Sequence, residues 1–195
     1  MKQSIRLSVH WRSLLVSAAI STVAFVALEI YLLPRVISAL AQHKLTDTPV
    51  VTHEGRAPLN HISHVQRLAT SNDRVIVRPN NDTFYSSAWL DLNKEPVILE
   101  VPAMGERYYS LQIMDAWTNA FAYVGTRATG QKPGVFGIVG PAWSGTLPAG
   151  VTRILSPTAT VWVIGRTMVH GPEDVAEVIK LQEGIKLGPM SGYRP

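Results

Sequence analysis

Cysteine is absent from the 195-residue chain. The protein therefore has no disulfide framework, no thiolate nucleophile, no iron–sulfur cluster and no zinc site built on cysteine. Two sequence motifs are missing as well, a glycine-rich phosphate loop and a G-x-S-x-G nucleophile elbow. These absences exclude the enzyme classes that a short motif identifies most directly, and no local pattern specifies a reaction.

Charged residues make up only 16% of the chain, and they are unevenly placed. Residues 1–44 contain five basic residues and one acidic residue, whereas residues 45–195 contain thirteen of each, so the formal charge of +4 comes from the N-terminal part. A neutral body has no electrostatic footprint for a phosphate backbone. We therefore expect no nucleic acid among the partners.

Residues 13–33 form an apolar run of 21 residues in which Glu29 is the single charged side chain. A helix of this length spans roughly 30 Å, which matches the hydrocarbon core of a bilayer. Lys2, Arg6 and Arg12 precede the run, and positive charge favours the cytoplasmic side. The sequence thus predicts a cytoplasmic segment at 1–12 and a single-pass transmembrane anchor at 13–33. If the host is a Gram-negative bacterium, the anchor would lie in the inner membrane, with the C-terminal domain in the periplasm.

Two other interpretations of the apolar run stay open. Ala39-Leu40-Ala41 has the small-x-small form of a signal-peptide cleavage site, although the run exceeds the roughly 7–15 residues of a signal core and Arg35 separates the two. A helix of a soluble core is the other alternative, and the lack of a polar face makes it the weaker one. An uncleaved anchor fits the pattern best.

The rest of the chain is predicted to contain a connector at 34–59, helical to about Ala41, and one β-rich domain at 60–195. The domain is expected to begin with a short helix at 60–68 that Asn60 caps. Eight short segments rich in β-branched and aromatic residues follow, separated by turn formers. They are 74–78, 84–91, 97–101, 108–114, 120–124, 135–139, 153–155 and 160–165.

Eight short strands at close spacing predict a mainly β fold, an antiparallel β-sandwich or partly closed barrel with short helices. The segment 160–164 is apolar on both faces, which indicates a central strand covered on each side. One helix is expected at about 172–184, because Pro172 suits its first position and apolar residues follow at helical spacing. The tail after Ile185 is expected to be loosely held.

A metal site is not favoured. His61 and His64 lie three residues apart on the expected helix, a spacing that can share a metal ion, but zinc or iron needs a third ligand. His53, Glu54 and His170 are available for that role, and nothing in the sequence places them beside the pair. We therefore expect no metal and no cofactor.

The most unusual segment is the polar loop at 78–86, where four turn-forming residues lead into an aromatic strand. Asn and Asp side chains in such a loop cap turns and bond their own backbone. The same groups would line a pocket if they met the polar residues of the later strands. On that alternative the ligand-binding candidates are Asn80, Asn81, Asp82, Tyr85, Arg107, Tyr109, Asp115, Asn119, Arg127 and Arg166.

From this loop onward the chain carries several motifs in a fixed order. They are Pro79-Asn80-Asn81-Asp82-Thr83-x-Tyr85-Ser86, Arg107-Tyr108-Tyr109-x-x-Gln112-x-x-Asp115, Gly140-Pro141-x-Trp143-x-Gly145 and Gly171-Pro172-Glu173-Asp174. Over roughly residues 60–190 the sequence resembles the bacterial family catalogued as domain of unknown function 1254. The resemblance implies a mainly β domain and no established activity. Many members of that family continue into a second β domain, of the family of unknown function 1214, which this chain does not reach before Pro195.

We therefore expect a membrane-anchored envelope protein whose domain is a non-catalytic ligand-binding or assembly module. Its expected partner is a second β domain, of family 1214, on a separately encoded chain, docking over Trp143, Leu147, Met190 and Tyr193. Alternatively, the domain's own tail or a second copy of the same chain covers those side chains. The alternative function is an enzyme, or an enzyme subunit, that acts on a small molecule in the envelope through the polar loop.

Overall fold

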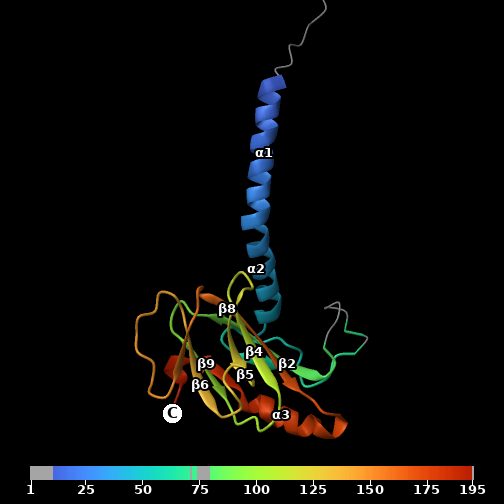
Figure 1. The fold of residues 1–195 in the computed structure, drawn as a ribbon, viewed down its shortest axis with the longest axis vertical. Coiled ribbons are helices and arrows are strands. Elements are labelled where there is room, and N and C mark those ends of the chain that lie inside the picture. Colours follow the sequence, from blue (N-terminus) through green and yellow to red (C-terminus); the bar gives the residue numbers. More distant parts are fainter. Residues whose placement is uncertain (1–10, 71, 74–79, 195) are drawn as a thin grey trace, which may run out of the picture. The chain divides into compact units, whose positions relative to one another are not determined.

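The structure is a computed structural model that describes residues 11–70, 72–73 and 80–194. The chain divides into two compact units, Met1–Ala39 and Leu40–Pro195. Figure 1 shows a helical N-terminal part and a C-terminal unit that holds the strands. The strand predicted at 74–78 lies outside the described residues.

The N-terminal helices confirm an apolar segment long enough to cross a membrane. Helix α1 spans Trp11–Tyr31 and α2 spans Leu33–Thr46, and together they form one candidate span, Trp11–Thr46. Every residue of α1 is exposed. A helix that is apolar all round and unburied by protein suits lipid, because its backbone polar groups are satisfied within the helix. Helix α2 ends five residues beyond the predicted Ala41.

The C-terminal unit is built from two sheets around one core. The first sheet has the order β1-β2-β8-β4-β5, with antiparallel neighbours throughout, and the second has the order β7-β6-β3-β9, in which β6 and β7 alone pair in parallel. The strands of the first sheet are β1 (Ile62–His64), β2 (Thr83–Asp91), β8 (Thr160–Met168), β4 (Tyr109–Met114) and β5 (Ala120–Gly125). Those of the second are β7 (Thr152–Leu155), β6 (Gly134–Val139), β3 (Val97–Val101) and β9 (Lys186–Pro189). In the described part of the chain neither sheet closes into a barrel, so the sandwich is the predicted alternative that forms.

Alternating side chains explain how the two sheets share a core. Tyr109, Leu111 and Ile113 of β4 are each at most 1% exposed and pack with residues of both sheets. Strand β8 is central, as predicted, but its burial alternates: Val161 and Val163 are buried, while Trp162 and Ile164 are half-buried. The prediction that both faces of this strand are covered is therefore too strong. Residues on the far side of the first sheet, away from the core, form what we call its outer face.

The predicted helix at 60–68 is wrong, because the chain forms β1 there. Asn60 has φ = 62°, a left-handed conformation that asparagine tolerates better than most residues. Its amide side chain bonds the backbone N–H and C=O of Asp91, which turns the chain into register with β2. Asn60 therefore fixes the turn that leads into the β1–β2 strand pair and caps no helix.

The C-terminal tail is also more ordered than predicted. It contributes β9, which pairs with β3 from Val97 to Glu100, and a short 3₁₀ helix, η2 (Met190–Gly192). Ser191 binds the Glu95 carboxylate through its N–H and its hydroxyl. The expectation of a loosely held tail is wrong, since an edge strand accommodates Gly188 and Pro189.

A helix forms close to where the sequence predicted one. It comprises a 3₁₀ turn, η1 (Pro172–Asp174), followed by α3 (Val175–Gly184). Val178 and Gln182 of α3 are fully buried. Val178 packs with Phe84 and Val169 in a second apolar cluster, which joins α3 to the first sheet.

Candidate functional site

The ten predicted site residues do not converge on one pocket. The structure distributes them over the loop before β2, the two ends of β4 and the outer face of the first sheet. A six-residue strand such as β4 is about 20 Å long, so Arg107 before it and Asp115 after it belong to separate places. The site residues are therefore described group by group.

The polar loop at Asn80 uses its side chains to build a turn. Asn80 Oδ1 accepts the Asp82 N–H at 2.9 Å, and the Asn80 N–H donates to the Tyr85 hydroxyl at 2.9 Å. The Val169 N–H donates to the Asp82 carbonyl, which joins the loop to the end of β8. The side chains of Asn81 and Asp82 are exposed.

Arg107 belongs to a structural clamp. Its guanidinium donates to both carboxylate oxygens of Asp174 at 2.5 and 2.6 Å, and to the Met168 carbonyl at 2.8 Å. Both side chains are largely buried, with 11% and 15% exposure. The hydrogen bonds from Arg107 and from the His170 N–H lower the pKa of Asp174 to about 2. The clamp fixes the start of α3 to the first sheet.

Two further predicted residues stabilise the turn after β4. Asp115 Oδ1 accepts the N–H groups of Trp117 and Asn119 at 2.8 and 2.9 Å, and Oδ2 accepts Asn119 Nδ2 at 3.1 Å. The side chains of Asp115 and Asn119 thereby hold the β4–β5 connection.

Tyr109 is 1% exposed, and its hydroxyl donates to the Gly130 carbonyl at 3.0 Å. Burial raises the pKa of Tyr109.

The remaining three, Tyr85, Arg127 and Arg166, lie toward the outer face of the first sheet. The Arg166 guanidinium lies 5.6 Å from the centre of the Tyr85 ring. Arg127 lies in the same way over Tyr108, at 6.0 Å. Both arginines are exposed, so they remain available to a ligand, as do the exposed side chains of Asn81 and Asp82.

The histidine pair does not form a metal site with other described residues. The described chain contains no group of three or more His, Cys, Asp or Glu side chains placed to hold a metal. His61 is exposed and its Nδ1 lies 2.9 Å from the Leu59 carbonyl, whereas His64 is 9% exposed and faces the core from β1. The two rings therefore have different surroundings.

His64 belongs to a buried chain of hydrogen bonds that the sequence did not reveal. Gln182 Nε2 of α3 donates to the Tyr85 carbonyl and to Ser86 Oγ, both at 3.2 Å. His64 Nδ1 lies 2.8 Å from the same Ser86 Oγ, and the imidazole also bonds the backbone of Ile185. These hydrogen bonds link β1 and β2 to Gln182 of α3 and to Ile185, which follows that helix.

A carbonyl only accepts, so Gln182 presents its NH₂ group to the Tyr85 carbonyl and to Ser86. Burial is the largest influence on the His64 imidazole and lowers its pKa to about 4. The hydrogen bond between the imidazole and the Ile185 backbone acts in the opposite direction and raises the pKa, so the ring donates it. The hydrogen of the neutral ring is therefore on Nε2, and Nδ1 accepts the Ser86 hydroxyl hydrogen. Ser86 is 1% exposed, so this serine–histidine pair is closed to a substrate and is structural.

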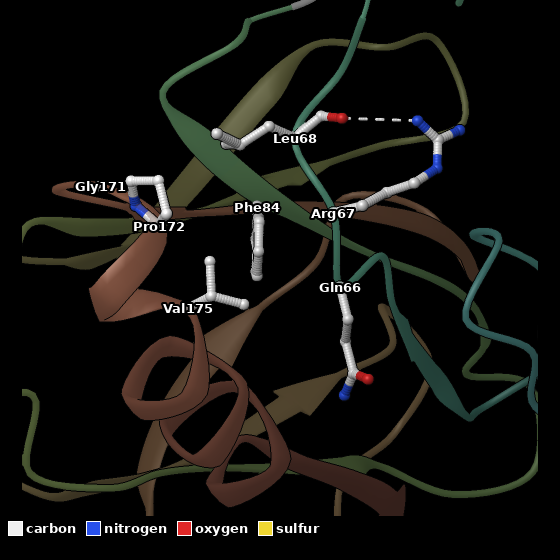
Figure 2. A pocket seen from close by; sticks show the side chains of 7 residues that line it. All are labelled: Gln66, Arg67, Leu68, Phe84, Gly171, Pro172 and Val175. Carbon is white, nitrogen blue, oxygen red and sulfur yellow. Dashed lines mark hydrogen bonds between the residues drawn. The ribbon is translucent and has the colours of Figure 1, made fainter.

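A surface pocket of about 360 Å³ lies beside the start of α3. Its walls are the side chains of Leu68, Phe84, Pro172 and Val175, with Gly171, Gln66 and Arg67 at the rim. Figure 2 shows Phe84 and Val175 close together in the pocket, while the polar ends of Gln66 and Arg67 extend away from Phe84. The pocket therefore presents an apolar surface.

The polar side chains at the rim of the pocket, Arg67 and Gln66, form hydrogen bonds that do not involve the cavity. Arg67 pairs with both oxygens of Asp73 at 2.8 and 2.6 Å and reaches the Leu68 carbonyl at 3.4 Å. This pairing lowers the pKa of Asp73. Gln66 Nε2 donates to Glu183 Oε1 at 3.3 Å. No nucleophile, acid or base among the described lining residues faces the cavity, so its chemistry is apolar binding.

Sequence reasoning did not predict this pocket. Phe84 was assigned to a strand and Val175 to a packing stripe, both correctly. The cavity arises because Pro172 and Leu68 meet them from segments 104 residues apart in the chain. The sequence offers one signal of such a cavity. The apolar residues at helical spacing in α3 begin only after Gly171-Pro172, so the apolar side of the helix is short at its N-terminal end.

The four side chains predicted to form a docking surface are half-buried. The Arg153 guanidinium lies 5.5 Å from the centre of the Trp143 ring. Tyr193 follows η2, and the Met190 N–H bonds the Pro96 carbonyl.

Comparisons with known proteins give a family and a fold. The model of the family described as "Protein of unknown function (DUF1254)" matches residues 59–189. The crystal structure of the VPA0106 protein from Vibrio parahaemolyticus is similar, with 31% identity and a TM-score of 0.60 over 70% of this chain. The match covers 32% of the Vibrio protein, so this chain corresponds to about a third of its length.

A second crystal structure, of an uncharacterised protein from Burkholderia cenocepacia, gives 9% identity and a TM-score of 0.44 over 69% of this chain and 36% of that one. No curated protein matches the chain.

Proposed function

This chain belongs to the DUF1254 family of proteins of unknown function, as its motifs predicted, and we propose that it is a membrane-anchored binding domain of the bacterial cell envelope without catalytic activity of its own. The anchor is the apolar span Trp11–Thr46. The basic residues Lys2, Arg6 and Arg12 precede it in the sequence. Positive charge on that side favours a domain that faces the periplasm.

The apolar pocket is the observation that carries the binding role. Its size is in the range of small-molecule sites, and its walls offer dispersion contacts and no reactive group. The polar groups that a catalytic site would need are instead occupied by the Asn80 turn, the Arg107 clamp and the Asp115 turn. The ligand would be a small apolar molecule or an apolar side chain of a partner.

The binding role is tested by nuclear magnetic resonance of methyl groups in the full chain, held in lipid nanodiscs. Indole serves as the probe, and Leu68 and Val175 report on the pocket. Leu155 of β7, which is 59% exposed, reports on unspecific contact. Indole should shift the Leu68 and Val175 resonances in a saturable manner and leave Leu155 unchanged.

A matched pair of variants makes this test specific. Val175→Trp fills the pocket and should abolish the shift at Leu68, whereas Ala176→Trp adds the same bulk at the neighbouring exposed position of α3 and should preserve it. Equal shifts at Leu155, or a Leu68 response that survives Val175→Trp, would contradict binding in the pocket.

We also propose that the domain pairs with a second β domain of family 1214 on another chain. In support, about two thirds of the Vibrio relative lies outside the part that matches this chain, so there the domain occurs together with other polypeptide. Purification of the tagged full chain in mild detergent should recover such a protein in a fixed ratio. Recovery of a monomer or a homo-oligomer alone would contradict this pairing while leaving the pocket test unaffected.

A further inference from the structure

Two exposed arginines lie over tyrosine rings at one end of the first sheet. Arg166 of β8 covers Tyr85 of β2, and Arg127, in the turn after β5, covers Tyr108. Within the described ranges neither guanidinium forms an ion pair, because the three ion pairs found there involve other residues. Two cations therefore have no acidic partner among the described residues.

The strand register brings the two arginines to the same end of the first sheet. Arg166 pairs with Tyr85 on one side and with Ser110 on the other, and Ser110 pairs with Gly125. Tyr108 precedes Ser110 by two residues and so lies on the same face, diagonal to Arg166 at about 7–8 Å between Cα atoms. Arg127 reaches Tyr108 from the other side. Arg166 thus lies beside Ser110 in the register and extends its guanidinium over Tyr85, while Arg127 extends its guanidinium over Tyr108.

The outer-face row through Arg166 and the row beside it contain several hydrogen-bond donors and no carboxylate. The outer-face row through Arg166 consists of Tyr85, Arg166, Ser110 and Gly125, and the next row consists of Ser87, Ile164, Gln112 and Tyr123. Neither row has an acidic residue. A row of donors beside two unpaired cations attracts an anion, since guanidinium and hydroxyl groups donate to its oxygens.

We propose that Arg127 and Arg166 bind an anionic group, a phosphate or a carboxylate, of a soluble ligand. Each ring supports the flat face of its guanidinium and leaves the N–H edges directed at the ligand. The Tyr108 and Ser110 hydroxyls supply further donors. This site goes beyond the apolar pocket and is separate from it, because Phe84 faces the core side of β2 and the adjacent Tyr85 faces the outer side.

Pyrophosphate is the probe for this site, because its two phosphate groups can engage two cations at once. The full chain in nanodiscs of purely zwitterionic lipid is titrated with pyrophosphate, and the thermal midpoint is measured at constant ionic strength set with sodium chloride. The midpoint should rise with pyrophosphate as expected for a ligand that binds the folded state. Loss of either arginine should weaken the apparent affinity about tenfold or more, as for a hydrogen-bonded charge.

The variants are Arg127→Gln and Arg166→Gln, with Arg153→Gln as the matched control. Arg153 also lies over an aromatic ring, that of Trp143, but in the other sheet. The proposal is supported if Arg153→Gln responds like the natural chain and the other two do not. It is overturned if pyrophosphate has no effect on the natural chain, or if Arg153→Gln weakens the response as much as the other two changes.

A lipid headgroup is the competing source of the same chemistry, and a second nanodisc preparation separates it. If phosphatidylglycerol in the disc removes the response to pyrophosphate, lipid phosphate occupies the site and the soluble ligand is overturned. An unchanged response in both preparations supports the soluble ligand. Either result is independent of the indole test, which reports on the pocket alone.

Discussion

His64 accepts a hydrogen bond from Ser86 in the interior of the domain, with 2.8 Å between Nδ1 and Oγ. Gln182 donates to the same serine from α3, so the neutral imidazole is the form that the core accommodates. A charged imidazole would lose the Ser86 donor and would lie in an environment of low polarity. This relationship makes the stability of the domain depend on pH.

We predict that the domain loses stability as the pH falls from about 6.5 to about 4. The folded pKa of His64, about 4, lies below its ordinary value of 6.5, so the unfolded chain binds the proton first and is favoured in that interval. The stabilising effect is complete above pH 6.5 and is lost in full below pH 4. The loss amounts to about 3 kcal/mol in the free energy of unfolding.

Urea denaturation of the full chain at pH 7, 5.5 and 4.5 measures this loss. Glu183 and His53 both act on the His64 ring, in opposite directions, and they do not change the sign. His64→Gln should flatten the dependence above pH 4, whereas His61→Gln, at an exposed histidine, should leave it intact. A dependence that survives His64→Gln would assign the effect to another group.

A second prediction compares two arginine–aspartate pairs that have the same bidentate geometry and differ in burial. Arg107→Ala removes the largely buried partner of Asp174 and should lower the free energy of unfolding by about 2–4 kcal/mol, because a carboxylate is left unpaired near the core. Arg67→Ala removes the partner of Asp73, where the arginine side chain is 61% exposed, and should lower the free energy of unfolding much less, because solvent screens the pair.

Chemical denaturation at pH 7 measures both changes. The Arg107→Ala variant should also show a raised pKa for Asp174, since its main cause of lowering is gone. Equal losses in the two variants would mean that burial does not distinguish the pairs.

The third prediction assigns the stabilising role in the polar loop to Asn80. Asn80→Ala removes the acceptor for the Asp82 N–H and should cost about 1 kcal/mol. Asp82→Ala should be close to neutral, because its exposed side chain accepts no hydrogen bond from the described residues while its backbone does the bonding. Thermal melts of both variants decide between them, and a larger loss for Asp82→Ala would reverse the assignment.

Alternation of side chains made most of the strands predictable. In β2 and β4 the apolar and β-branched residues recur with the spacing of a half-buried strand. The predicted bounds of β2, β4 and β6 differ from the observed ones by one residue at one end. Strand β1 was mistaken for a helix because three residues are too few to show a period. Strand β9 was missed because Gly188 and Pro189 are typical of turns, and only the backbone of β3 stabilises them as an edge.

The site was less predictable because its contacts join distant parts of the chain. Arg107 and Asp174 are 67 residues apart and Ser86 and Gln182 are 96 apart, so no local spacing indicates either pair. The sequence could identify Tyr85, Arg127 and Arg166 as polar residues on strands or turns. It could not show that Arg166 lies beside Tyr85 and Ser110 on neighbouring strands, since this follows from the register of three strands.

The last prediction concerns the direction in which the chain crosses the membrane. Lys2, Arg6 and Arg12 lie before the apolar span, and basic residues close to a span stay in the cytoplasm. A reporter that is active only in the periplasm should therefore be active when fused after Pro195, and a reporter active only in the cytoplasm should be silent there. Replacing all three basic residues by glutamine should reduce the difference between the two reporters.

The same fusion distinguishes an anchor from a cleaved signal. Ala41 lies inside α2, within the apolar candidate span that runs to Thr46. We therefore expect the membrane fraction to contain the fusion at its full length, detected with a tag at the N-terminus. A mature protein that begins near Gln42 would establish cleavage, and activity of the cytoplasmic reporter would reverse the orientation. Cleavage would remove the membrane anchor from the proposed function, and a reversed orientation would remove the periplasmic location of the domain. The tests of the pocket and of the arginine pair are separate from both results.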